Sequence, residues 1–223
     1  MKIAGYQKTS LQDFPGKIAS IIFTQGCNFS CGYCHNADLI PRDAQDLMRE
    51  GDIFDHIVQR KHILDGVVIT GGEPTIQEGL IDFIRKLRQY GMLVKLDTNG
   101  SKPDILKALI EGELVDYVAM DYKFPLEEYK FLTAYSGKGI AESKDLMISS
   151  NVAHEFRITL IEDLFSEERL QTIANELKGA RLICLQKFHN EHANSEEYRK
   201  YKPTTHQFMD YAREFFEGEV VLR

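Results

Sequence analysis

Short β-branched or apolar runs alternate with longer amphipathic segments along the whole 223-residue chain. This alternation is typical of βα units around a parallel sheet, because each buried strand is followed by a helix that covers it. Six such units fall short of the eight units and about 250 residues of a closed (β/α)8 barrel. We therefore predict an α/β fold: a partial (β/α)6 TIM-like barrel, open at the side, with a parallel sheet and outer helices. The expected strands are Ile18–Thr24, Gly66–Thr70, Leu93–Asp97, Val115–Met120, Glu155–Leu160 and Arg181–Gln186.

Two helices between these strands have recognisable starts. Residues 77–90 repeat apolar side chains at helical spacing, and residues 75–78 form a capping box in front of them. Pro103 suits the first turn of the following helix, with Ser101 as its cap.

The C-terminal part of the chain predicts two further elements. A last amphipathic helix is expected to open at residues 204–207 and to run to about Phe216. Residues 219–223 form a short apolar run that could add a small extra strand.

Composition limits the domain organisation and the location. No linker, internal repeat or low-complexity segment interrupts the chain, so we expect one domain over residues 1–223. The N-terminal residues contain no apolar signal segment, and no apolar run approaches the roughly 20 residues that span a bilayer. A cytoplasmic protein that does not use a membrane is therefore expected. The net charge of -7 argues against nucleic acid as the main partner.

Three of the four cysteines, Cys27, Cys31 and Cys34, lie in one short segment with the spacing C-x3-C-x2-C. Structural zinc sites and cubane iron–sulfur clusters normally take four protein ligands, so three thiolates leave one coordination position open for chemistry. Clustered thiols without an even-numbered disulfide framework fit a reducing compartment. Cys184 lies within an apolar run and is expected to be a small core residue.

Polar residues that could carry chemistry lie on or directly after every expected strand. The carboxyl ends of parallel strands are where α/β folds assemble their active sites. Taken singly, each group has an ordinary explanation as a turn, a surface ion pair or a surface histidine. Their convergence beside an open metal site favours function. Besides the cysteine segment, the groups are residues 71–74, 97–100 and 121–123, Arg157 with Thr159, and residues 187–190.

The cysteine spacing, with Tyr33 just before the third cysteine, and the Gly-Gly-Glu-Pro stretch at residues 71–74 resemble the radical S-adenosylmethionine superfamily. Asp13-Phe14-Pro15-Gly16 and Cys34-His35-Asn36 resemble, more narrowly, the activating enzymes of glycyl radical enzymes. Within these, residues 8–17 look most like the activating protein of anaerobic ribonucleoside-triphosphate reductase. The related pyruvate formate-lyase activases usually read Asp-Gly-Pro-Gly where this chain has Phe14.

The resemblance implies that Cys27, Cys31 and Cys34 hold three irons of a [4Fe-4S] cluster, and that S-adenosylmethionine chelates the fourth iron. It implies reductive cleavage of S-adenosylmethionine to methionine and a 5′-deoxyadenosyl radical. That radical takes a hydrogen atom from a glycine of a partner enzyme, expected to be anaerobic ribonucleoside-triphosphate reductase, and leaves a glycyl radical. A flavodoxin or ferredoxin is the expected electron donor. The remaining cysteine cannot ligate a second cluster.

The same resemblance implies the contacts of the methionyl group. Gly72 and Glu73 would bind the ammonium, for which a carboxylate and a backbone carbonyl are suitable partners. Lys123 and Arg157 would meet the carboxylate, and an arginine can do so with two hydrogen bonds.

Further roles are implied for five residues. Tyr33 and His189 would contact the adenine. Asp97 and Asp121 match the place where some activases hold a monovalent cation. Asp13 matches a position that approaches the incoming glycine loop.

Three alternatives remain open. The chain could activate pyruvate formate-lyase or another glycyl radical enzyme, or it could be a radical enzyme acting on a small molecule such as a deazapurine precursor. It could also be a non-catalytic zinc-binding domain with His35 as the fourth ligand. The adjacent Cys34 and His35 would strain a zinc tetrahedron, and that alternative leaves residues 71–74 unexplained.

Overall fold

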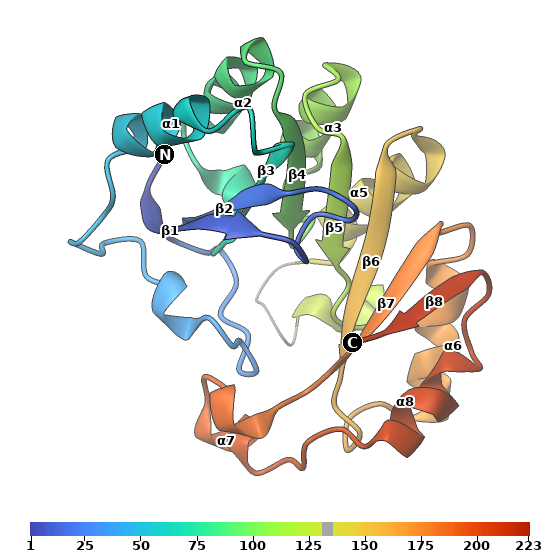
Figure 1. Cartoon of the computed structure of the whole chain (residues 1–223). Helices are drawn as coiled ribbons and strands as arrows, with labels where there is room; N and C mark the ends of the chain where they lie inside the picture. The colour runs from blue at the N-terminus through green and yellow to red at the C-terminus, as the bar shows by residue number, and fades with distance from the viewer. Residues whose placement is uncertain (131–135) are drawn as a thin grey trace. The chain divides into compact units, whose positions relative to one another are not determined.

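Eight strands follow one another in sequence order across the sheet of the computed structural model, which describes residues 1–130 and 136–223 (Figure 1). β1 (Ile3–Ser10) runs antiparallel to β2 (Ala19–Thr24), whereas the β2–β3, β3–β4, β6–β7 and β7–β8 pairs are parallel. The sheet is mostly parallel and not closed, which confirms the predicted α/β partial barrel. The other strands are β3 (Gly66–Gly71), β4 (Leu93–Thr98), β5 (Tyr117–Asp121), β6 (Ala153–Leu160), β7 (Leu182–Lys187) and β8 (Glu219–Leu222).

Helices separate most of the strands. The α-helices are α1 (Glu50–Gln59), α2 (Leu80–Gln89), α3 (Pro103–Glu111), α5 (Lys138–Ser149), α6 (Glu167–Glu176), α7 (Glu196–Arg199) and α8 (His206–Arg213). Short 3-10 turns are η1 (Ala37–Leu39), η2 (Pro74–Ile76), η3 (Leu126–Glu128) and η4 (Asn190–His192).

The chain forms two compact units. The first comprises Met1–Asn28, Asp38–Thr98 and Lys102–Ala119. The second comprises Phe29–Ala37, Asn99–Ser101 and Met120–Arg223. The single domain expected over residues 1–223 stays a prediction.

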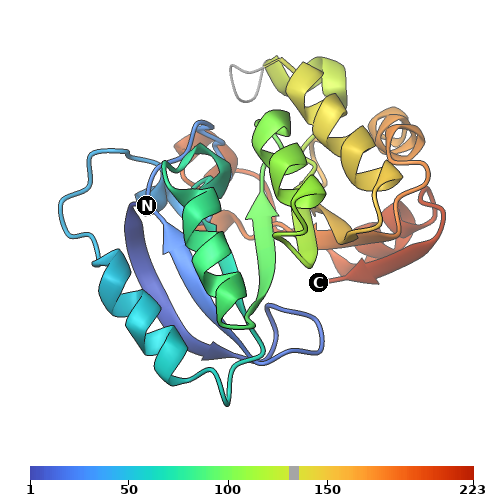
Figure 2. The ribbon, with the colours of Figure 1, turned by 90° about the horizontal axis from the view of Figure 1, so that it is seen from above.

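In the first unit both faces of β3 are buried, as is usual for parallel strands covered by helices. Val67 and Ile69 alternate with Val68 along β3, and all three are buried. α2 contacts β4 and runs alongside the strands of this unit as the blue-green helix in Figure 2, beside the brighter green α3. The apolar face of α2 repeats at helical spacing, which is why this helix was predictable. Its buried residues are Leu80, Phe83, Ile84 and Leu87.

The second unit has its core along β6 and β7. Phe156, Ile158 and Leu160 on β6 are fully buried, and α8 contacts β7. Cys184 on β7 is also fully buried and free. Its prediction as a core residue is confirmed.

Two elements extend the six predicted strands. The short run at the C-terminus forms β8, parallel to β7, as the sequence suggested. β1 was missed, because only Ile3 and Ser10 at its ends are buried and residues 4–9 contain no run of large apolar side chains. A strand of this composition lacks the apolar run by which the others were found.

The predicted start of α2 was wrong. The helix begins at Leu80, after Gly79 with φ 81°, and Thr75 lies in η2. The carboxylate of Glu73 caps η2 by accepting a hydrogen bond from the Thr75 amide, so the segment 73–76 forms its own turn.

The other helix boundaries were partly right. Pro103 opens α3 as predicted, but the N-cap residue is Lys102 and not Ser101. The Ser101 amide donates a hydrogen bond to Asn99 Oδ1. α8 begins after Thr205, whose hydroxyl accepts from the Phe208 amide at 3.1 Å, and it ends at Arg213.

In the described part of the chain, none of the helices combines the length and the apolar character needed to cross a membrane.

Phe14 tests how the loop between β1 and β2 is anchored. Its side chain is 4% exposed, belongs to a core cluster with Ala19, Ile21 and Val68, and lies with its ring centroid 6.3 Å from that of Tyr117. We expect Phe14→Ala to lower the free energy of unfolding by about 3–5 kcal/mol, because the lost ring leaves a cavity.

Urea denaturation monitored by circular dichroism measures this change. Leu11→Ala in the same loop is the control, because Leu11 is 73% exposed and should change stability by less than about 0.5 kcal/mol. Equal small effects for both variants would contradict the anchoring role of Phe14.

Candidate functional site

The end of β3 lies in close backbone contact with the end of β2. The Gly72 amide donates to Thr24 O at 2.8 Å, and the Glu73 amide donates to Gly26 O at 2.9 Å. A Cβ atom on Gly71 would lie 2.3 Å from Thr24 N, and one on Gly72 would lie 2.2 Å from Gly26 O. Gly71 also has φ +111°, a conformation that other residues rarely adopt. The two glycines are therefore required for this approach, and they fix the residue that precedes Cys27.

Glu73 links the ends of β3 and β4. It is fully buried, and its Oε1 accepts hydrogen bonds from the Thr75 amide at 3.0 Å and from Thr98 Oγ1 at 2.6 Å. Because a buried carboxylate is costly without partners, these donors hold it in one orientation. Its predicted contact with a methionyl ammonium stays a prediction.

The cysteine segment supplies three thiols, none of which is in a disulfide. The Cys27 amide donates to Ile40 O at 3.1 Å in the first unit, and the Cys34 amide donates to Cys31 O at 3.1 Å in the second. Burial raises the pKa of the Cys31 thiol, and the charge of Lys123 opposes that shift.

Within residues 1–130 and 136–223, no group of three or more His, Cys, Asp or Glu side chains is gathered so that it could hold a metal ion. The fit of an iron–sulfur cluster therefore rests on donor chemistry. Three thiols in eight consecutive residues, none of them in a disulfide, are the donor set that such clusters use.

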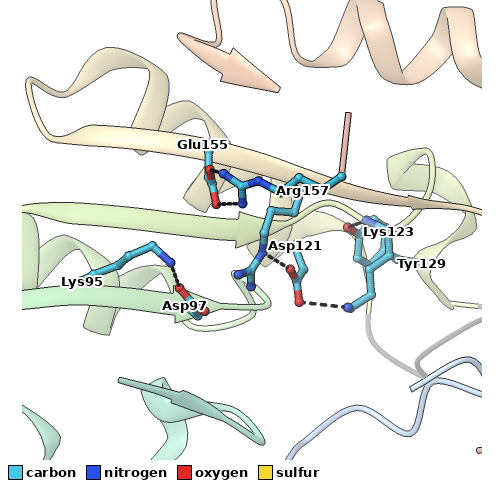
Figure 3. A network of polar contacts seen from close by, with 8 residues as sticks. Lys95, Asp97, Asp121, Lys123, Tyr129, Glu155 and Arg157 are labelled. Carbon is cyan, nitrogen blue, oxygen red and sulfur yellow. Dashed lines mark hydrogen bonds and ion pairs between the residues drawn. The ribbon is translucent and has the colours of Figure 1, made fainter. Parts of the chain in front are cut away.

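Asp121 at the end of β5 forms ion pairs with two cationic side chains of the second unit (Figure 3). Arg157 Nε lies 2.8 Å from Asp121 Oδ1, and Lys123 Nζ lies 3.4 Å from Oδ2. Burial pushes the pKa of Asp121 upward, but the charges of Arg157 and Lys123 outweigh burial and lower this pKa to about 2. The Lys123 amide also donates to the hydroxyl of Tyr129 at 2.8 Å. These contacts bring three of the predicted residues together.

Tyr33 lies beside this charged group. Lys123 Nζ is 5.7 Å from the centroid of the Tyr33 ring, within the range of a cation–π contact. The ring is buried and lies 5.6 Å from the ring of Tyr198. Gly32 allows that packing, because a Cβ atom there would meet Tyr198 at 2.4 Å. The residue predicted to meet adenine is thus adjacent to one predicted to meet a carboxylate.

His189 belongs to a group of three histidines. The ring of His35 lies 6.5 Å from that of His189 and 6.0 Å from that of His192. Burial, with the charges of His192 and His189, lowers the pKa of His35. Sequence reasoning used His35 as part of the activase resemblance and as an alternative zinc ligand. It missed His192, although its position three residues after His189 could have drawn attention to it.

Asp97 at the end of β4 has a lysine partner that sequence reasoning missed. Lys95 Nζ lies 2.6 Å from Asp97 Oδ1 (Figure 3). The signal was available, because residues two apart on a strand share a face and a lysine is unusual in a buried strand.

Asp13 lies in the loop after β1. Its carboxylate accepts a hydrogen bond from the Ser10 hydroxyl, and that hydroxyl accepts from the Asp13 amide at 3.3 Å. The loop is thus fixed on both sides of Leu11 and Gln12. The predicted approach of Asp13 to a partner's glycine loop stays a prediction.

The predicted site residues are divided between the two units. The first unit places Gly72 and Glu73 at the end of β3 and Asp97 at the end of β4, and Thr98 connects the two strand ends. Cys27 and Asp13 also belong to the first unit. The second unit holds Cys31, Tyr33, Cys34, Asp121, Lys123, Arg157 and His189.

Comparisons with known proteins agree with these features. A family profile described as the Radical SAM superfamily matches residues 21–175. A protein of Methanocaldococcus jannaschii that is named as a glycyl-radical enzyme activating enzyme is 34% identical over 205 residues, covering 89% of this chain and 84% of that protein. The pyruvate formate-lyase 1-activating enzyme of Escherichia coli K12 is 27% identical over 216 residues, covering 89% of this chain and 87% of that enzyme.

Among solved structures, SuiB of Streptococcus suis bound to the precursor peptide SuiA matches with a TM-score of 0.68 and 13% identity. The match covers 91% of this chain and 48% of that one, so the chain spans about half the length of SuiB. At this identity the likeness shows the fold alone.

Gly72→Ala tests the close approach of β3 to β2. The added methyl group collides with Gly26 O, so we expect the variant to lose about 1–3 kcal/mol of stability. It should also retain less iron after anaerobic reconstitution, because the residue before Cys27 must move.

Gly51→Ala on α1 is the matched control, since nothing lies within 4 Å of the added Cβ atom. It should lose no stability, because alanine is a better helix former than glycine. Urea unfolding and iron analysis of both variants make the comparison. A Gly72→Ala protein that matched Gly51→Ala in both measurements would refute the argument.

Asp121 gives a pH prediction whose sign follows from its low pKa. The pKa is lowered in the folded state from the ordinary 3.8 to about 2. The ionised carboxylate therefore contributes stability that is fully present above about pH 4. This contribution is lost as the pH falls through the folded-state pKa of about 2.

We expect the wild type to lose more stability between pH 5 and pH 2.5 than Asp121→Asn, which cannot titrate at this position. Urea unfolding across this range measures the difference. Asp82→Asn on α2, where the carboxylate is exposed, should behave like the wild type. An identical acid dependence in wild type and Asp121→Asn would contradict the role of the Arg157 and Lys123 charges.

Proposed function

Because the chain belongs to the radical SAM superfamily and, within it, to the glycyl-radical enzyme activating enzymes, we propose that it generates a glycyl radical on a partner enzyme. The observation that carries this proposal is the segment of three cysteines outside any disulfide that follows the tight β2–β3 contact. Three thiolates leave one cluster position for a substrate, which a closed structural site would not.

Radical SAM proteins use a [4Fe-4S] cluster with S-adenosylmethionine. Cys27, Cys31 and Cys34 would hold the cluster. When bound, the cluster and S-adenosylmethionine supply a one-electron cleavage that yields methionine and a 5′-deoxyadenosyl radical. The task of the protein is to orient these groups and to keep water and other hydrogen donors away.

The charged group around Asp121 suits the methionyl carboxylate. Arg157 and Lys123 carry two positive charges against the single negative charge of Asp121, so this trio keeps a net positive charge. Asp121 holds both cations in place before the ligand arrives, which reduces the cost of ordering them. Arg157 and Lys123 would then meet the carboxylate.

The remaining contacts follow from side-chain chemistry. Glu73, oriented by Thr75 and Thr98, would accept from the methionyl ammonium together with the backbone of Gly72. Tyr33, whose ring is buried beside Lys123, and His189 with its ring nitrogens would contact the adenine.

The proposed partner is anaerobic ribonucleoside-triphosphate reductase, on the basis of residues 8–17. The loop after β1 is suited to meet a partner, because Phe14 anchors it, Ser10 holds Asp13, and Leu11 is exposed. Pyruvate formate-lyase is the competing partner, since an activating enzyme of that protein is 27% identical to this chain. A flavodoxin or ferredoxin as electron donor and a cytoplasmic location stay predictions.

The decisive experiment is anaerobic cluster reconstitution followed by reduction in the presence of S-adenosylmethionine. We expect 5′-deoxyadenosine from the wild type and none from Cys31→Ala. Cys184→Ala is the matched control, because this buried thiol lies outside the segment and should leave the iron content and the product unchanged.

Candidate partners are then added one at a time, and the glycine-centred doublet is sought by electron paramagnetic resonance. Deuterium transfer from a Cα-deuterated glycine into 5′-deoxyadenosine would prove abstraction from that glycine. Transfer from a small molecule in place of a protein would favour the deazapurine-type alternative. Stoichiometric zinc without iron, and no 5′-deoxyadenosine, would support the alternative of a non-catalytic zinc-binding domain.

A further inference from the structure

Lys95 is a buried cation on the first unit's strand β4. Its side chain is 4% exposed and that of Asp97 is 12% exposed, with 2.6 Å between Nζ and Oδ1. The ammonium also lies 5.8 Å from the centroid of the Tyr117 ring. Both charges are therefore removed from most of the solvent and lie on the same strand face.

Such a pair requires an explanation beyond stability. Burying two charges costs free energy that their attraction offsets only in part, and apolar pairs of similar volume often stabilise a fold as well. The neighbouring residues 94 and 96, which point to the other face of β4, are a buried valine and leucine. An apolar residue at position 95 would match this pattern. The reason for a lysine there is therefore its ion pair with the carboxylate of Asp97.

Asp97 is one of the two residues, with Asp121, for which the family resemblance implies a bound monovalent cation. An ammonium carries the same charge as such an ion and already lies at hydrogen-bond distance from the carboxylate. The following residue, Thr98, donates a hydrogen bond to Glu73. The position of Asp97 on β4 is therefore linked to that of Glu73 in the candidate site.

We infer that Lys95 is a built-in cation for Asp97, which holds this carboxylate in place without a bound monovalent metal ion. Lys95 is thus a positioning residue that acts through Asp97. Its effect on ligand binding rests on the proposed function, whereas its effect on cation dependence is a property of the folded chain alone.

The test compares potassium or sodium chloride with tetramethylammonium chloride at equal ionic strength, since the bulky ion cannot enter a buried site. The full chain without cluster is heated in each salt. We expect the wild-type midpoint to differ by less than about 1 °C between the salts. Lys95→Met should be less stable in tetramethylammonium and should regain about 3 °C or more in potassium or sodium, because an ion then occupies the vacated place.

The second readout is the dissociation constant of S-adenosylmethionine for the reconstituted chain in the same salts. It should change less than about twofold for the wild type and about tenfold or more for Lys95→Met. Lys144→Met on α5 is the matched control, because Lys144 also contacts an aspartate, Asp145, at 2.5 Å but lies on a helix. It should show no cation response.

Saturable stabilisation of the wild type by potassium or sodium would overturn the inference. A folded Lys95→Met whose thermal midpoint is the same in all of the salts would also overturn it. If Lys95→Met does not fold, the double variant Lys95→Met/Asp97→Asn decides. Recovered folding without a cation response supports the inference, because removing the carboxylate's charge also removes the need for a cation. Failure to produce 5′-deoxyadenosine would reject the proposed function and leave the thermal result valid.

Discussion

The backbone of Gly71 and Gly72 lies against that of Thr24 and Gly26, and the candidate site of the first unit depends on this contact. No side chain larger than hydrogen fits there, so the sequence has little freedom at these positions. The approach fixes where the cysteine segment begins, and it places Glu73 where Thr98 can reach it. One steric constraint thereby links the ends of three neighbouring strands.

Electrostatics adds a second level of organisation at the strand ends. Asp97 and Asp121 each have a cationic partner whose side chain is at least four-fifths buried, Lys95 in one case and Arg157 in the other. Ionised groups in such surroundings are held in place by their partners, because separating them would leave a charge without compensation. Carboxylates held in this way keep one orientation without a ligand, which is an advantage for chemistry that must exclude water.

The sequence predicted the apolar part of the fold well and the polar part incompletely. Strands such as β3 were found because both of their faces are buried, whereas β1 has no run of large apolar side chains and was missed. Alternation along a strand tells which face a residue occupies but not which residue of another strand it meets. The pairing of Arg157 with Asp121 therefore required the structure, while that of Lys95 with Asp97, on one strand, could have been inferred.

Phe14 shows how a departure from a family pattern can have a packing cause. Pyruvate formate-lyase activases usually have glycine at this position, which makes the phenylalanine look like a sign of a different partner. In the structure the side chain is buried against Tyr117 in a core cluster that also contains Val68, so a partner cannot contact it directly. The exposed side chain in the same loop is Leu11, and the backbone around it is fixed by Ser10 and Asp13. Partner choice is therefore better sought in the residues that Phe14 holds at the surface than in Phe14 itself.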